Sequence, residues 1–284
     1  MFKKILVSLG DSPNTETALY NTCELASKFG SQVVCLYVTD LSKVQSACIT
    51  CAQMPEMMVS LEPCYEPEIV EEINKEMLRE ESVVTDYFEE YKKLYPQLDI
   101  TLEKCSGEVH TEILARVKNY DLLVMGKTVH EEEDDFTTLG ESFHKVIHKS
   151  TIPVLACTKD NNIGANLLLC YDGKKPAKKA LEYAIATAEA FRVPLNILTA
   201  GMLQQEVEEI NEEALKKALS RGVEVVQHVQ PFNTVGAITG LVKRLSIDFL
   251  FMGAYGDNPV KDLFLGSTTD MVLKQTGCPI LLCR

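Results

Sequence analysis

The sequence predicts an α/β protein made of two repeated domains, each an open, mainly parallel sheet of five strands with helices on both faces. Three observations predict this fold. The chain has 284 residues, which is enough for two ordinary domains. Short apolar runs alternate with amphipathic segments, as they do in proteins with parallel sheets. The second half of the chain also repeats the pattern of the first.

The repeat begins with a strand, a polar turn, an amphipathic helix and a second strand. In the first half this unit is FKKILVSLGDSPNTETALYNTCELASKFGSQVVCLYV, residues 2–38. In the second half it is ANLLLCYDGKKPAKKALEYAIATAEAFRVPLNILTA, residues 165–200. Apolar residues recur every three or four positions in the second copy of the helix, at Ala180, Ala184, Ile185, Ala188 and Phe191. This spacing gives the helix one apolar face.

The later strands repeat as well. DLLVMG at 121–126 matches DFLFMG at 248–253, and TIPVLACT at 151–158 matches CPILLCR at 278–284. Such continuous apolar runs are typical of strands that are buried on both faces. Each half therefore contains five strands with helices between them.

A short polar linker, KDNNIGAN, separates the halves, and we predict domains at 1–160 and 165–284. Ligands of parallel sheets bind beyond the carboxyl ends of the strands, where the strand order switches. In the second half these places are the loop after the first strand, Tyr171-Asp172-Gly173, and the loop that begins at Gly253. We expect the binding site there.

The first half carries an insertion of roughly thirty-five residues between its second and third strands, at about 41–95. Its acidic part, 69–95, is predicted to be a helix. Cys48, Cys51 and Cys64 precede that helix. Thiolates at this spacing can bind zinc or form a redox pair. A third interpretation is that they are loop cysteines without a ligand, and all three interpretations remain open.

The composition excludes several kinds of partner. A net charge of -13 argues against nucleic acid, which needs clustered lysine and arginine. No apolar run approaches the roughly 20 residues that span a bilayer, and the N-terminus resembles a strand rather than a signal peptide. We therefore expect a cytoplasmic protein that binds neither nucleic acid nor membrane. The ten cysteines lie largely in apolar runs, which does not indicate a disulfide framework.

The second half has a glycine-rich loop after its fourth strand, MGAYGDNPVKDLFLGSTTD, which runs from Met252 to Asp270. Gly253 allows close approach to the backbone, and Gly256 permits a turn that points N–H groups inward. Gly266 and Ser267 open a helix whose free N–H groups suit an anion. The ammonium of Lys261 is a further candidate ligand for a phosphate.

The pattern Gly-x-x-Gly-x9-Gly-Ser in this context resembles the ATP-binding motif of the universal stress protein family, and the resemblance covers the chain as a tandem pair. It implies that Asp172 lies on the adenine side, that Thr199 lies beside the nucleoside, and that Met252, Gly253 and the loop glycines hold ribose and phosphate. It assigns the phosphates to Gly266, Ser267, Thr268 and Thr269. Tyr255 stands where the family commonly has His or Arg, so it can stack or donate instead.

The first half departs from this motif at four places. Val129 replaces the second glycine, and five acids, Glu131 to Asp135, follow it. Glu141 aligns with Ser267, and Gly10 aligns with Asp172. Each acid would repel phosphate. We predict that only the second half binds a nucleotide and that the first half is a scaffold or a different sensor; the acid run indicates a solvated loop rather than a metal site.

The resemblance implies a nucleotide-dependent regulator of the stress response that binds ATP with Mg²⁺, with AMP and ADP as open alternatives. A slow ATPase is the second hypothesis, although no residue is an evident base; Asp257 and Asp262 are the nearest candidates. A zinc or redox sensor at the inserted cysteines is the third. In the family the last strand of each domain pairs across a dimer interface, which implies an internal pseudo-dimer here and leaves a further homodimer open.

Overall fold

The computed structural model describes residues 1–10, 12, 14–42, 67–127, 139–201, 204–231, 234–254 and 266–284. Within these residues the strands are β1 (Lys4–Leu9), β2 (Gln32–Asp40), β3 (Ile100–Gly107), β4 (Leu122–Gly126), β5 (Val154–Cys157), β6 (Leu167–Cys170), β7 (Leu195–Gly201), β8 (Val225–Pro231), β9 (Phe249–Gly253) and β10 (Ile280–Cys283). The α-helices are α1 (Thr15–Phe29), α3 (Pro67–Leu94), α4 (Val109–Arg116), α5 (Glu141–Lys149), α6 (Lys175–Phe191), α7 (Gln204–Ser220), α8 (Thr234–Arg244) and α9 (Ser267–Gln275). A 3-10 turn, η2 (Val117–Asn119), follows α4.

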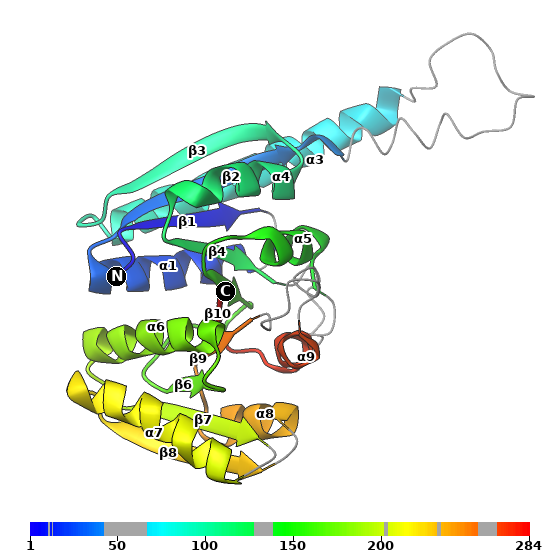
Figure 1. The fold of residues 1–284 in the computed structure, drawn as a ribbon. Coiled ribbons are helices and arrows are strands. Elements are labelled where there is room, and N and C mark those ends of the chain that lie inside the picture. The colour runs from blue at the N-terminus through cyan, green and yellow to red at the C-terminus, as the bar shows by residue number, and fades with distance from the viewer. Residues whose placement is uncertain are drawn as a thin grey trace, which may run out of the picture.

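The strands form one sheet of ten, in the order β3-β2-β1-β4-β5-β10-β9-β6-β7-β8 (Figure 1). All pairs within a half are parallel, as predicted. The two halves meet at β5 and β10, which pair antiparallel with Leu155 opposite Leu281. The last strands of the two domains therefore join the halves, as the internal pseudo-dimer requires.

Helices cover both faces of this sheet (Figure 1). One apolar core lies under α1, α3, α6 and α7, and a second lies under α4, α5, α8 and α9. The acidic segment predicted as a helix is α3, which buries Val84, Phe88 and Tyr91 against the first core. None of the helices in the described segments combines the length and the apolar character that a membrane span needs.

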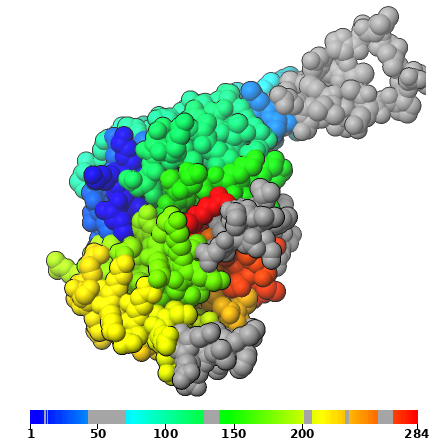
Figure 2. Space-filling model, viewed as in Figure 1, coloured from blue at the N-terminus to red at the C-terminus, as the bar shows by residue number. Residues whose placement is uncertain are grey.

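The first core is continuous across the two halves. Phe2, which precedes β1, stacks on Tyr183 of α6 with ring centroids 5.1 Å apart and an interplanar angle of 3°. Both halves contribute buried side chains to the same cluster. Figure 2 accordingly shows the blue-to-green first half packed directly on the second half.

Two buried asparagines of the first half hold the linker between the domains. The backbone N–H of Lys159 donates to Oδ1 of Asn14 at 2.7 Å, and that of Ile163 donates to Oδ1 of Asn21 at 2.8 Å. Both asparagine side chains are buried. The linker therefore lies against the start and the middle of α1, which fixes where the second half begins.

The β5–β10 contact gives a first prediction. Leu281 is fully buried in the contact, so Leu281→Ala should lower the free energy of unfolding by roughly 2–5 kcal/mol, because it removes apolar contacts and leaves a cavity. Urea denaturation measures this change. Leu78→Ala is the matched control, since Leu78 is 67% exposed on α3 and its truncation should change stability by less than about 0.5 kcal/mol. Equal stabilities for the two variants would contradict the proposed importance of the contact.

Candidate functional site

The second half contains a pocket at the carboxyl ends of its strands, where strand order switches between β6 and β9. Its volume of about 470 Å³ is in the range of small-molecule sites. The lining comes from the loop after β6, from β7, β9 and the start of α8, and from the first turn of α9. The lining residues are Cys170, Tyr171, Asp172, Lys174, Leu198, Ala200, Thr234, Ile238, Met252, Gly253, Gly266, Ser267, Thr268 and Thr269.

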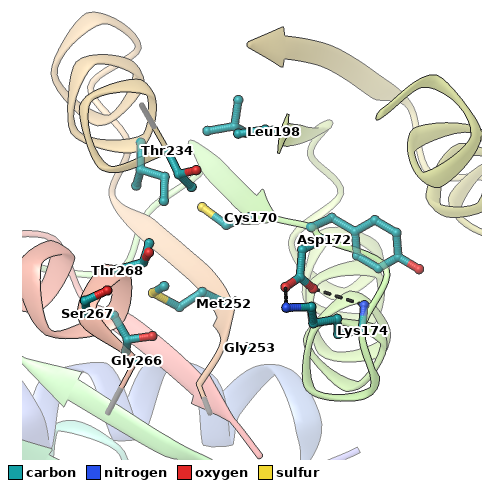
Figure 3. Close-up of a pocket in the computed structure, with 14 residues that line it drawn as sticks. Cys170, Asp172, Lys174, Leu198, Thr234, Met252, Gly253, Gly266, Ser267 and Thr268 are labelled. Carbon is teal, nitrogen blue, oxygen red and sulfur yellow. Dashed lines mark hydrogen bonds and ion pairs between the residues drawn. The ribbon is translucent and has the colours of Figure 1, made fainter. Parts of the chain in front are cut away.

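The start of α9 faces this pocket. Gly266 is the N-cap residue, with φ −56° and ψ 142°, and Ser267, Thr268 and Thr269 form the first turn. The first N–H groups of a helix have no acceptor within the helix, and the helix dipole is positive at this end. Figure 3 shows Ser267 and Thr268 on one side of the pocket, with Asp172 and Lys174 on the other and Met252 between them. The first turn can therefore hold an anion such as a phosphate group.

Asp172 and Lys174 form a charged pair at the rim of the pocket (Figure 3). The backbone N–H of Lys174 donates to Oδ1 of Asp172 at 3.0 Å, and its Nζ lies 3.8 Å from Oδ2. Asp172 therefore shapes the turn before α6 in addition to facing the pocket. Because both side chains are about half exposed, the ion pair itself is weak, and the Lys174 ammonium is available to an anionic ligand.

Tyr171 and Thr199 are both buried, but they differ in their relation to the pocket. Tyr171 contributes to the lining, and burial together with the Glu213 and Asp172 carboxylates raises the pKa of its hydroxyl, which therefore stays protonated. Thr199 is outside the lining; its hydroxyl donates to Oδ1 of Asn211 on α7 at 3.3 Å. Its neighbours Leu198 and Ala200 line the pocket instead, because successive residues of a strand point to opposite faces.

Gly253 is needed for helix packing. A Cβ at this position would lie 2.7 Å from the backbone N of Ala177 and 3.0 Å from the carbonyl carbon of Pro176, at the start of α6. Gly126 has the same place in the first half, where a Cβ would lie 2.7 Å from Cβ of Asn14. The Met-Gly pair is thus shared by both halves for a structural reason, although Gly253 also borders the pocket.

Several predicted residues lie outside the part of the chain that the structure describes. They are Tyr255, Gly256 and Lys261 of the glycine-rich loop, Cys48, Cys51 and Cys64 of the insertion, and the acids from Glu131 to Asp135. Among the described residues, no group of three His, Cys, Asp or Glu side chains is placed to hold a metal ion. The zinc and redox hypotheses therefore stay predictions.

Sequence reasoning missed the apolar wall of the pocket and Lys174. The wall includes Leu198 in the middle of β7, Ile238 of α8 and Cys170 at the end of β6, and Thr234 at the start of α8 lies beside it. One signal was available for Cys170 and Ala200, since both lie at or near the carboxyl ends of strands. The start of α8 gave no such signal.

The first half has a corresponding pocket of about 370 Å³ that is charged differently. Its described lining includes three carboxylates, Asp40, Glu80 and Glu141, and no lysine or arginine. Glu141 occupies the first position of α5, where Ser267 stands in α9. A hydrogen bond from Lys145, with Nζ 2.7 Å from the carboxylate, lowers the pKa of Glu141, so this group remains ionised. Its negative charge opposes the binding of an anion at the start of α5.

Comparisons with known proteins agree with the tandem architecture. The sequence model of the Universal stress protein family matches residues 1–158 and again residues 165–284. Universal stress protein Slr1230 of Synechocystis sp. is 24% identical over 298 residues, covering 99% of this chain and all of the relative. A universal stress protein of Thermus aquaticus is 32% identical over 133 residues, which is 42% of this chain and 97% of the relative.

A solved structure shows the same fold. The crystal structure of a universal stress protein from Archaeoglobus fulgidus DSM 4304 superposes with a TM-score of 0.76 at 20% sequence identity. The superposition covers 99% of this chain and 98% of the other. The fold of this chain is therefore shared, over almost its whole length, by that solved structure.

The contact between Gly253 and α6 gives a second prediction. Gly253→Ala should destabilise the protein by about 1–3 kcal/mol, because the new Cβ meets the backbone of α6 and β9 must shift. Gly240→Ala is the control with the opposite sign: nothing lies within 4 Å of its Cβ, and alanine in a helix interior gains up to about 1 kcal/mol over glycine. Chemical denaturation of both variants measures the difference. A Gly253→Ala variant as stable as the parent would show that the close approach is not required.

Proposed function

Because this chain belongs to the universal stress protein family, we propose that it is a nucleotide-dependent regulator of the stress response whose second half alone binds ATP, together with Mg²⁺. One observation carries the proposal: the two halves have pockets at equivalent places, and their charges differ. In the second pocket Lys174 balances Asp172 within the described lining, whereas the first pocket has carboxylates alone among its charged groups.

The phosphates occupy the first turn of α9 in this proposal. Hydrogen-bond donors come from the backbone N–H groups and the hydroxyls of Ser267, Thr268 and Thr269. Lys174 supplies a positive charge from the opposite rim. The base packs against Leu198 and Ile238 of the apolar wall and against Met252. The resemblance to the family motif adds Gly256 and Lys261, which lie outside the described residues, to the proposed site.

The first pocket rejects the same ligand for an electrostatic reason. The carboxylate of Glu141, although paired with Lys145, stands at the start of α5 where the phosphates would bind, and it repels a negative charge there. Glu141 stays ionised, and Asp40 and Glu80 add to the repulsion. A polyanion such as ATP therefore binds the second pocket in preference.

Binding rather than catalysis is the function that the described pocket supports. Hydrolysis of ATP needs a group that positions or deprotonates a water molecule near the γ-phosphate. Within the described lining the carboxylate is Asp172, at the rim opposite α9, whereas Asp257 and Asp262, the candidate bases, lie outside the described residues. We therefore propose a regulator that senses the nucleotide, and a slow ATPase that uses Asp257 or Asp262 stays the second hypothesis.

Titration calorimetry with Mg²⁺ and ATP tests this proposal. The unmodified protein should bind one ATP per chain. Ser267→Glu, which copies Glu141 into the second half, should weaken binding by about tenfold or more, because it places a carboxylate beside the phosphates. A glutamate in the first turn is favourable for a helix, so the variant should remain folded.

Glu141→Ser is the matched control, since it makes the reciprocal exchange in the first half. It should leave the affinity of the second pocket unchanged. Two equivalent ATP molecules per unmodified chain, or equal affinities for Ser267→Glu and the parent, would contradict the proposal.

A further inference from the structure

Lys127 is a fully buried lysine that bridges the two halves. It follows β4 in the first half, and its backbone is held there: its N–H donates to the carbonyl of Cys157 at 3.0 Å, and its carbonyl accepts from Gly140 at 2.9 Å. The side chain crosses into the second half. There Nζ donates to the carbonyl of Leu273 at 2.7 Å and to that of Thr276 at 2.5 Å.

These two carbonyls lie at the C-terminal end of α9. The last carbonyls of a helix have no partner within the helix, and this end of the helix dipole is negative. A buried ammonium is costly unless it is hydrogen-bonded, so its position is set closely by the acceptors it finds. Lys127 and α9 therefore fix each other's position.

The other end of α9 is the first turn that faces the pocket. A helix of nine residues is about 14 Å long and behaves as a rigid rod over that length. A displacement of its C-terminal end consequently moves or tilts Ser267, Thr268 and Thr269. Hydrogen bonds to phosphate oxygens depend steeply on such displacements.

We propose that Lys127 is a positioning residue for the anion site of the second half, acting from the first half through the C-terminal end of α9. This inference rests on the proposed function, because it concerns the same nucleotide site. The first half would then help to position α9, and this role does not depend on the pocket of the first half.

The reverse anchor uses a different residue. Nη1 of Arg284, at the end of the chain, donates to the carbonyls of His148 and Ser150 at 3.0 and 3.2 Å, at the C-terminal end of α5. The position equivalent to Lys127 in the second half is Ala254, whose N–H donates to the carbonyl of Cys283 at 2.7 Å. The halves thus anchor each other's helix: among the described residues, a fully buried ammonium holds α9, whereas the partly buried guanidinium of Arg284 holds α5.

The charge of Lys127 makes the anchor sensitive to pH. Burial lowers the pKa of Lys127 from 10.5 to about 8, and the titratable groups that face its side chain are the thiols of Cys278 and Cys157. Burial raises the pKa of Cys278 to about 11 and that of Cys157 to about 12, so both thiols are neutral near pH 8. Above pH 8 the amine loses its charge and its hydrogen bonds to the two carbonyls weaken. Nucleotide affinity should therefore fall as the pH rises through that value.

Calorimetry with Mg²⁺ and ATP from pH 7 to pH 9.5 tests the proposal on three proteins: the parent, Lys127→Met and Arg284→Met. The parent should lose affinity by several-fold as the pH rises. Lys127→Met should bind about tenfold more weakly than the parent at pH 7 and show a flat profile. Arg284→Met, which removes the anchor of α5, should keep the affinity and the profile of the parent.

Circular dichroism establishes that each variant is folded, and Lys127→Gln, which keeps a neutral donor, replaces Lys127→Met if the latter does not fold. A purely structural role would change stability without removing the pH dependence of affinity. If the parent binds ATP and the Lys127 variants keep its affinity and profile, the positioning role is overturned and the proposed function stands. If the parent binds no ATP, both are overturned.

Discussion

The antiparallel pairing of β5 with β10 is the contact on which the rest of the structure depends. Each half ends in a short apolar strand, and such a strand at the edge of a sheet invites association unless it is covered. Here the two strands cover each other, with Leu155 opposite Leu281 and Val154 opposite Leu282. The pairing turns two sheets into one and makes the core beneath α1 and α6 continuous.

The two halves share the features that the fold needs and differ in the chemistry of their pockets. Both copies keep a glycine that the fold needs. Gly126 lets the end of β4 approach Asn14 at the start of α1, and Gly253 lets the end of β9 approach the start of α6. The pocket linings have diverged, and the starts of α5 and α9 are the clearest case, with Glu141 in one and Ser267 in the other. A duplicated domain can lose a binding site while it retains its role in holding its partner.

Much of the fold could be predicted from the sequence, because the relevant signals are local. The order of strands and helices and the long helix α3 follow from apolar periodicity and from the repeat, whereas the joining of the last strands was implied by the resemblance to the family. The turn at Asp172 and the helix start at Gly266 could also be predicted. Asp172 lies just before α6, and Gly266 lies just before α9. The place of the pocket then follows from the general behaviour of parallel sheets.

The parts that could not be predicted depend on contacts between distant segments. Lys127 is one lysine after a strand, and its role requires knowing that α9 ends beside it. Thr199 shows a finer limit: an alignment places the strand correctly, but a difference of one residue decides whether a side chain meets α7 or the pocket. The wall formed by α8 is a third case, because nothing in its sequence marks Thr234 or Ile238 as neighbours of the strand ends.

The central claim is that one helix start in this chain binds the phosphates and that its counterpart does not. Hydrogen exchange of the backbone amides, measured with and without Mg²⁺ and ATP, tests it directly. We predict slower exchange with ATP in the first turn of α9, Ser267–Asp270, and no change in the first turn of α5, Glu141–His144. Equal protection of both turns, or protection of α5 alone, would contradict the account.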